Sequence, residues 1–285
     1  MQTHDSLDVA QPVRIMALGD SVTVMLPDQN YRERLAASCR AVGYNVNFVG
    51  AIGVDKLTTL TSRHSAISGI TAAEVDTHYI DSWMDLAEPD IVLMLLGAND
   101  IQGAQRSPED TIDSLRSIIL KMRITNPSIR VFLGMYPPIR PDLPDMATMI
   151  AMIPALAEEL HTTASPVTAV DHAPDFDIRI GADHIDLTHP NLNGDRKYAY
   201  NWFAAFVREG LCSAQPVLVN ATAGKPVNAD SVDAGDASTL LSHLVNGNIQ
   251  DNLYWARNTT QDVIISIDLQ GEYLFSYLEL SHCSS

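Results

Sequence analysis

The sequence predicts an α/β protein: a three-layer αβα sandwich around a five-stranded parallel sheet, followed by a C-terminal β-rich extension. Over the first 210 residues, short apolar runs rich in Val, Ile and Leu alternate with longer segments of helical period. This alternation is typical of a parallel sheet with helices on both faces. The chain has 285 residues, of which 46% are hydrophobic, enough for the core of one large domain and an appendage.

Five short apolar runs, most of them followed by a break and then a helix, are expected to form the strands of this sheet. They are residues 13–18, 45–50, 90–96, 128–135 and 167–170. Their length and their branched apolar side chains are typical of strands that are buried on both faces.

The segments between these runs carry the spacing of amphipathic helices. In residues 31–42, Leu35, Cys39 and Val42 share one face, so the Cys39 thiol is expected in the core. A Ser-Pro start precedes a second helix, whose apolar stripe consists of Ile112, Leu115, Ile119 and Met122.

Two further helices are expected in the second half of this region. Residues 145–161 read as a helix in which Pro154 should produce a kink. Residues 191–208 form the closing helix, and its aromatic stripe is most simply part of the core; the stripe consists of Tyr198, Trp202 and Phe206.

We expect three parts in the chain: an N-terminal tail of residues 1–12, the α/β domain of residues 13–212 and the extension of residues 213–285. After Gly210 the composition changes to Ala, Asn, Asp, Ser and Gly. Residues 262–269 and 272–280 then alternate in polarity on either side of a Gln-Gly pair, which predicts a β-hairpin.

Charge and cysteine content exclude several classes of partner. A formal net charge of -17 repels nucleic acid phosphates and anionic lipids. The sequence has no uninterrupted apolar stretch near the roughly 20 residues of a membrane span. Its three cysteines match no zinc motif, although Cys212 and Cys283 are candidates for a disulfide in an oxidising compartment.

Two motifs far apart in the chain supply the groups of a nucleophilic site. Gly19-Asp20-Ser21 follows the first apolar run, and Asp186-x-x-His189 comes near the end of the α/β region. A serine hydroxyl is a weak nucleophile unless an imidazole takes its proton and a carboxylate orients that imidazole. The order Ser21, Asp186, His189 therefore predicts an acyl-transfer site, in which Asp20 is assigned a supporting role; alone, Asp20 and Ser21 also read as an ordinary helix cap.

Two further polar turns are expected at the same edge of the sheet. Asn99 follows the third strand, and its amide N–H is suited to a developing oxyanion. Gly69 lets a backbone N–H approach the same point, because it has no side chain. An alternative uses Asp183, His184, Asp186 and His189 as metal ligands, but it leaves Ser21 and Asn99 without a role.

In that order and at those strand ends, the motifs resemble the four sequence blocks of the SGNH hydrolases, also called the GDSL esterase superfamily. The blocks here are Gly19-Asp20-Ser21, Gly69, Asn99 and Asp186-x-x-His189. The resemblance covers residues 13–209 and implies a flavodoxin-like sheet with no cofactor and no metal.

The resemblance also implies a role for each residue. Ser21 would be the nucleophile, His189 the general base and then acid, and Asp186 the orienting acid. The N–H groups of Ser21 and Gly69 and the side chain of Asn99 would form the oxyanion hole.

Within the superfamily the chain is most similar to carbohydrate esterase family 3, the acetyl xylan esterase-like group. The similarity lies in residues 13–21, 43–50, 89–93 and 189–194. Ala98 stands where a Thr is common, and Ile67 replaces a residue that is usually polar. Neither position performs the chemistry, so these departures bear on the substrate more than on hydrolysis.

The resemblance implies a serine esterase that deacetylates carbohydrate, with acylated xylan or a related glycan as partner. Hydrolysis of a lipid ester or thioester on the same fold is an alternative, since a fold does not fix a substrate. A carbohydrate-binding or adhesion protein is another, because residues 224–227, 244–247 and 263–269 faintly resemble the start of discoidin-like, galactose-binding β-sandwiches. We expect a secreted protein whose export signal is absent from the sequence shown.

Overall fold

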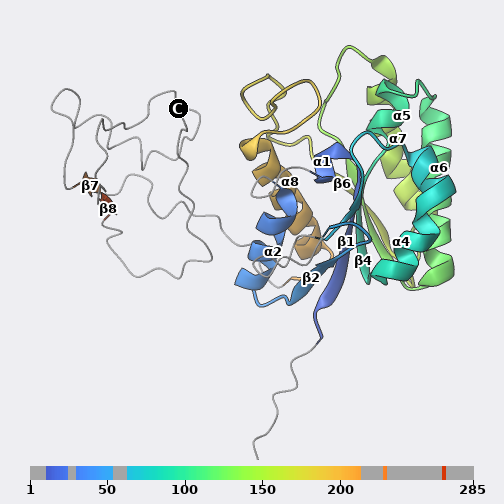
Figure 1. Ribbon diagram of the computed structural model, residues 1–285, viewed down its shortest axis with the longest axis horizontal. Coiled ribbons are helices and arrows are strands. Elements are labelled where there is room, and N and C mark those ends of the chain that lie inside the picture. The colour runs from blue at the N-terminus through green and yellow to red at the C-terminus, as the bar shows by residue number, and fades with distance from the viewer. Residues whose placement is uncertain (1–10, 25–29, 54–62, 213–226, 230–264, 268–285) are drawn as a thin grey trace, which may run out of the picture. The chain divides into compact units, whose positions relative to one another are not determined.

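The α/β region is built on a parallel sheet with the strand order β2-β1-β4-β5-β6 (Figure 1). A sixth strand, β3 (Ser65–Ala66), pairs with the end of β1 and was not predicted, because two residues carry no periodicity. All five expected strands are present, which confirms the predicted α/β class; they are β1 (Val13–Gly19), β2 (Val46–Val49), β4 (Ile91–Leu95), β5 (Arg130–Met135) and β6 (Val167–Asp171).

The computed structural model describes residues 11–24, 30–53, 63–212, 227–229 and 265–267. The chain divides into two compact units, Met1–Gln215 and Pro216–Ser285. The expected tail of residues 1–12 lies almost entirely outside the described residues.

Helices cover both faces of the sheet (Figure 1). On one face α2 (Tyr31–Ala41) packs against α8 (Leu192–Arg208). On the other, α6 (Pro108–Thr125) contacts both α4 (Ile80–Ala87) and α7 (Pro144–Leu160). Among the helices of the described ranges, none is long and apolar enough to cross a membrane.

Shorter helical turns join the strands to these long helices. They are α1 (Ser21–Val24), α3 (Ala72–Glu74), a π-helical turn η1 (Val75–Tyr79) and α5 (Ala98–Gln102). The expected helices 31–42, 145–161 and 191–208 match α2, α7 and α8 to within one residue, and α7 continues through Pro154. Helix α4 was not predicted; it follows directly on the π-helical turn.

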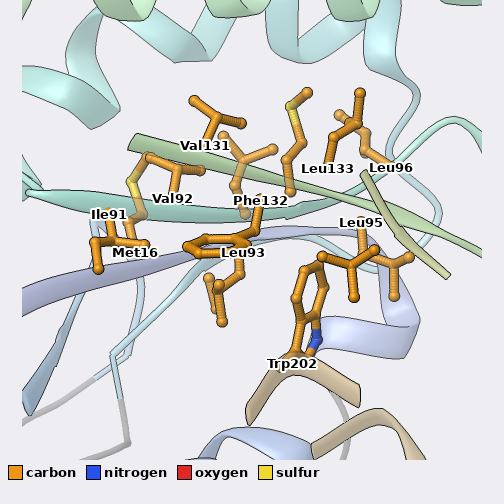
Figure 2. Packing of buried hydrophobic residues seen from close by; sticks show 14 of the residues in the cluster. Met16, Ile91, Val92, Leu93, Leu95, Leu96, Val131, Phe132, Leu133 and Trp202 are labelled. Carbon is orange, nitrogen blue, oxygen red and sulfur yellow. The ribbon is translucent and has the colours of Figure 1, made fainter. Parts of the chain in front are cut away.

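The core lies on both sides of the central strand β4, all five residues of which are buried. Figure 2 shows Leu93 and Trp202 on one side of the sheet and Val131 and Leu133 on the other. Trp202 reaches the sheet because Gly134 leaves room for it: a Cβ there would lie 2.9 Å from the ring. The aromatic stripe of α8 is thus part of the core, as predicted, and Trp202 is fully buried.

Two of the three cysteines meet in this core. Cys39 of α2 is fully buried, as predicted, and its thiol hydrogen-bonds that of Cys212, which follows α8. Burial raises the pKa of both thiols, that of Cys39 well above its ordinary value. Both cysteines are free thiols, and Cys283, the partner that the sequence allowed for Cys212, lies outside the described residues.

In the second unit, strands β7 (Val227–Ala229) and β8 (Ile265–Ile267) pair antiparallel. The predicted hairpin placed β8 opposite residues 272–280, which lie outside the described residues, as do 244–247 of the discoidin-like stretches. The described partner of β8 is instead β7, far from it in the sequence.

Truncation of the central strand should destabilise the whole α/β unit. Leu93→Ala removes a fully buried side chain from β4, and we expect it to lower the free energy of unfolding by about 2–5 kcal/mol. Leu86→Ala on α4 is the matched control: that side chain is 70% exposed, and its loss should cost less than about 0.5 kcal/mol. Urea denaturation checks both values, and equal costs would contradict this description of the core.

Candidate active site

Strand register brings three sequence motifs to one edge of the sheet. Gly19, the last residue of β1, pairs with Leu95 of β4 on one side and with Ala66 of β3 on the other. Ser21, Asn99 and Gly69 each follow one of these strand ends within four residues. The order of the sheet reverses between β1 and β4, and open α/β sheets bind ligands at such a switch point.

The turn after β1 has no room for a side chain at position 19. A Cβ there would lie 2.3 Å from Thr23 Oγ1 and 2.6 Å from the carbonyl oxygen of Leu95. Directly after this turn, Asp20 Oδ1 accepts the N–H of Val22 at 3.0 Å and so begins the short helix α1. The cap that the sequence offered as an alternative is therefore real, and it places Ser21 in the first turn of the helix.

Ser21, His189 and Asp186 form a continuous chain of hydrogen bonds. His189 Nε2 lies 2.8 Å from Ser21 Oγ, and His189 Nδ1 lies 2.8 Å from Asp186 Oδ2. Because the carboxylate accepts the Nδ1 proton, Nε2 is left to take the proton of the serine hydroxyl. This is the arrangement that nucleophilic acyl transfer requires.

The four-residue turn that carries the acid and the base is held by the acid itself. Asp186 Oδ1 accepts the N–H groups of Thr188 and His189, each at 2.7 Å. Partial burial acts to raise the pKa of Asp186, but these bonds and the imidazole outweigh it and hold the pKa below its ordinary value. Asp186 is 52% exposed and His189 33% exposed in their side chains, so the pair faces solvent.

Asn99 is hydrogen-bonded to the residue that follows Gly69, so two of the candidate oxyanion donors lie on connected segments. Asn99 Nδ2 donates to the carbonyl oxygen of Ile70 at 3.1 Å and approaches Asp20 Oδ2 at 3.4 Å. Gly69, the neighbour of Ile70, has a φ of 82°, a conformation in which other residues are strained, and it is exposed. The structure thus brings the predicted donor Asn99 to the loop that carries the predicted donor Gly69.

Asp100 contacts the same loop, and it was not predicted as a site residue from the sequence. Its fully buried carboxylate accepts the N–H of Ala72 at 2.6 Å and that of Ala73 at 3.3 Å, at the start of α3. Arg106 Nε lies 3.4 Å from the same carboxylate. The pair Asn99-Asp100 therefore anchors residues on both sides of Thr71.

Asp20 is the buried acid of the site. Only 1% of it is exposed, and its Oδ2 accepts the hydroxyl of Tyr136 at 2.7 Å. Burial raises the pKa of Asp20 to about 6, although Tyr136 and the N–H of Val22 stabilise the ionised form. Tyr136 comes directly after β5, so a polar side chain at the end of a fourth strand was the signal that could have found it.

The residues of the metal alternative do not converge. Asp183 Oδ2 accepts from Lys197 at 2.5 Å and from the N–H of Asp177 at 2.6 Å. The buried ring of His184 packs on Phe176 with centroids 4.9 Å apart. In the part of the chain that the structure describes, no group of three or more His, Cys, Asp and Glu is placed to hold a metal ion.

Comparisons with known proteins point to one family. The model of the GDSL-like Lipase/Acylhydrolase family matches residues 17–197. Solved structures with a similar fold include an acetyl esterase with bound acetate and a carbohydrate esterase family 3 protein from Talaromyces cellulolyticus. Each is 24% identical with a TM-score of 0.62, and each match covers 69% of this chain and 97% of the other.

A family 3 carbohydrate esterase from Clostridium thermocellum has a similar fold as well. It is 21% identical with a TM-score of 0.59, and the match covers 70% of this chain and 97% of that one. No curated protein matches the chain. At these identities the structural likeness establishes the fold alone.

Burial of Asp20 makes the stability of the fold depend on pH. With its pKa raised from 3.8 to about 6, the folded state holds this proton longer than the unfolded chain. Stability is therefore lost as pH rises from about 4 to about 6, by up to about 3 kcal/mol for this group. Asp20→Asn removes the ionisation and keeps an oxygen for the N–H of Val22. The free energy of unfolding of this variant, relative to that of the wild type, should therefore grow as the pH rises from about 4 to about 6.

Urea denaturation at pH 4, 5, 6 and 7 measures this advantage. Asp113→Asn, at an acid of α6 whose side chain is 72% exposed, is the matched control. A stability difference between Asp20→Asn and wild type that stays constant from pH 4 to pH 7 would contradict the raised pKa.

Proposed function

Because this chain belongs to the GDSL-like lipase/acylhydrolase family and is a carboxylic ester hydrolase, we propose that it removes acetyl groups from carbohydrate hydroxyls through an acyl-enzyme intermediate on Ser21. The observation that carries this proposal is the chain of two 2.8 Å hydrogen bonds from Ser21 through His189 to Asp186. The choice of an acetylated carbohydrate is supported by the similar fold of an acetyl esterase and of two family 3 carbohydrate esterases.

In the proposed first step, Ser21 Oγ attacks the carbonyl carbon of the ester while His189 Nε2 takes the hydroxyl proton. The C=O π bond breaks and its oxygen becomes an oxyanion. The N–H groups of Ser21 and Gly69 and the amide of Asn99 are the donors assigned to that oxygen. Asp186 stays ionised and stabilises the imidazolium, as its lowered pKa favours.

Collapse of this intermediate breaks the bond to the carbohydrate oxygen, which receives the proton from His189. Water then adds to the acyl-enzyme, with His189 again as the base, and acetate and free Ser21 are formed. The position of the acid and base on a solvent-facing turn suits a bulky leaving alcohol, because a carbohydrate polymer can reach the site without entering the core.

Replacement of the nucleophile tests the reaction and the substrate together. Ser21→Ala should lower acetate release from acetylated xylan, and hydrolysis of p-nitrophenyl acetate, by at least about a thousandfold. Acetylated pectin, chitin oligomers and sialic acid complete the panel. Ser128→Ala is the matched control, because Ser128 is an exposed serine at the opposite end of the strands, before β5.

Equal rates for wild type and Ser21→Ala would overturn the assigned nucleophile. A wild type that hydrolyses p-nitrophenyl acetate but releases acetate from none of the carbohydrates would overturn the proposed substrate and leave the esterase.

Acyl chain length distinguishes the proposed deacetylase from a lipid hydrolase. Ile185 and Leu187, on either side of Asp186, are 59% and 44% exposed. A hydrolase for long acyl esters would use such exposed apolar side chains to bind the acyl chain. We expect rates on p-nitrophenyl esters to fall beyond short chains, by about tenfold or more from acetate to octanoate, because the resemblance is to acetyl esterases. A rate that rises with chain length would instead support the lipid alternative.

A further inference from the structure

The catalytic use of Asn99 depends on which way its amide is turned. A side-chain amide rotated by 180° keeps its shape but exchanges its donor nitrogen and its acceptor oxygen. Only the orientation with Nδ2 toward Ile70 and Asp20 places the donor nitrogen beside Asp20, the neighbour of Ser21 in the chain. Something in the structure must therefore select this orientation.

Gln102, one helical turn after Asn99 on α5, contacts the other end of that amide. Its Nε2 donates to Asn99 Oδ1 at 3.0 Å. Its Oε1 accepts from Thr188 Oγ1 at 3.2 Å and faces Arg140 Nη1 at 3.5 Å. Hydrogen bonds thus run in a line from the donors Thr188 and Arg140 through the two amides to the carbonyl oxygen of Ile70.

The line has one arrangement in which every contact is a hydrogen bond. A guanidinium group has donors only, so the atom of Gln102 that faces Arg140 must be the oxygen. The nitrogen of Gln102 then faces Asn99, which must offer its own oxygen there. The nitrogen of Asn99 is left to face the carbonyl of Ile70, an acceptor only. Rotation of either amide would place two donors or two acceptors together at both of its ends.

The same line joins the oxyanion donor to the turn of the acid and base. Thr188 lies between Asp186 and His189 in this turn, and its N–H donates to Asp186 Oδ1 at 2.7 Å. The N–H of Arg140 donates to the carbonyl oxygen of Leu187 at 3.0 Å. Arg140 is itself held in place by Asp142, whose two oxygens it contacts at 2.9 and 2.7 Å.

We propose that Gln102 and Arg140 are positioning residues of the oxyanion hole, which turn the Asn99 amide so that its N–H serves the reaction. The proposal rests on the oxyanion role assigned to Asn99 under the proposed function. It requires neither residue to touch the substrate. It adds to the site two residues that fix the orientation of the Asn99 amide and that the sequence motifs do not contain.

Gln102→Met tests the relay, because methionine keeps the length of the side chain and removes both hydrogen-bonding atoms. With p-nitrophenyl acetate we expect kcat to fall by about tenfold or more, less than the roughly hundredfold to thousandfold loss from removal of a whole donor, with KM nearly unchanged. A trifluoromethyl ketone, whose serine adduct carries an oxyanion, should bind more weakly by the same factor as kcat/KM falls.

Gln102→Glu provides a second variant with an acid-dependent donor. Its carboxylate still accepts from Arg140 and Thr188 but has no proton for Asn99 Oδ1, so the variant should be impaired at pH 8. Protonation restores one donor, and the activity relative to wild type should therefore rise as the pH is lowered from 8 to 5. Arg140→Met, which removes the donor-only group, should lower kcat in the same direction as Gln102→Met.

Two matched controls separate the relay from general damage. Gln105→Met makes the same substitution at an exposed position three residues further on, and Arg116→Met removes an arginine of α6 that pairs with Glu159. Both should keep wild-type kcat, and thermal unfolding identifies any variant that fails to fold.

Wild-type kcat in folded Gln102→Met, or a loss of kcat without weaker binding of the ketone, would overturn the relay. A wild type without esterase activity would instead overturn the function assigned to the site. Because the assay uses p-nitrophenyl acetate, a failure to deacetylate carbohydrate leaves the test of the relay intact.

Discussion

The parallel pairing of β1 with two strands at once is the constraint on which the site depends. Gly19 lies between Leu95 of β4 and Ala66 of β3, so the three strands end side by side. Its close approach to the Leu95 carbonyl excludes any side chain at the turn that precedes α1. Asn99, which donates to the carbonyl oxygen of Ile70, and Asp100, which accepts the N–H of Ala72, then hold the segment after β3 at the same edge. The site is a consequence of strand register first and of individual side chains second.

The two acids beside the nucleophile work under opposite conditions. Asp20 is buried and holds the start of α1 together with Tyr136, and burial favours its neutral form. Asp186 lies half in solvent, where backbone N–H groups favour its charge. A carboxylate that must stay ionised to stabilise an imidazolium is therefore at the surface, and the one with a structural task is inside. The environment, and not the residue type, divides these roles.

Local patterns predicted much of this fold and of the candidate site, and long-range contacts account for the rest. The five strands could be predicted because runs such as 90–96 are apolar on both faces, and Ser21, Asn99 and His189 could be proposed because each stands in a polar turn. The strand order followed only from the resemblance to a flavodoxin-like sheet, and the two-residue β3 could not be predicted, since pairing depends on partners far away in the chain. Tyr136, Gln102 and Arg140 were missed because their contacts with Asp20, Thr188 and Gln102, respectively, join residues far apart in the sequence. The catalytic roles themselves stay predictions.

Strands β2 and β3 pair with the same side of β1. Residues Val13 to Met16 pair with β2, which ends at Val49, and Leu18 and Gly19 pair with β3, which begins at Ser65. We expect an insertion or deletion between β2 and β3 to leave the register of each strand with β1 unchanged, and with it the position of Ser21. Loops at the carboxyl ends of strands are where α/β enzymes vary their substrates. The pairing of β1 with two separate strands on one side therefore lets the connection between them vary in length while the nucleophile stays anchored to β1.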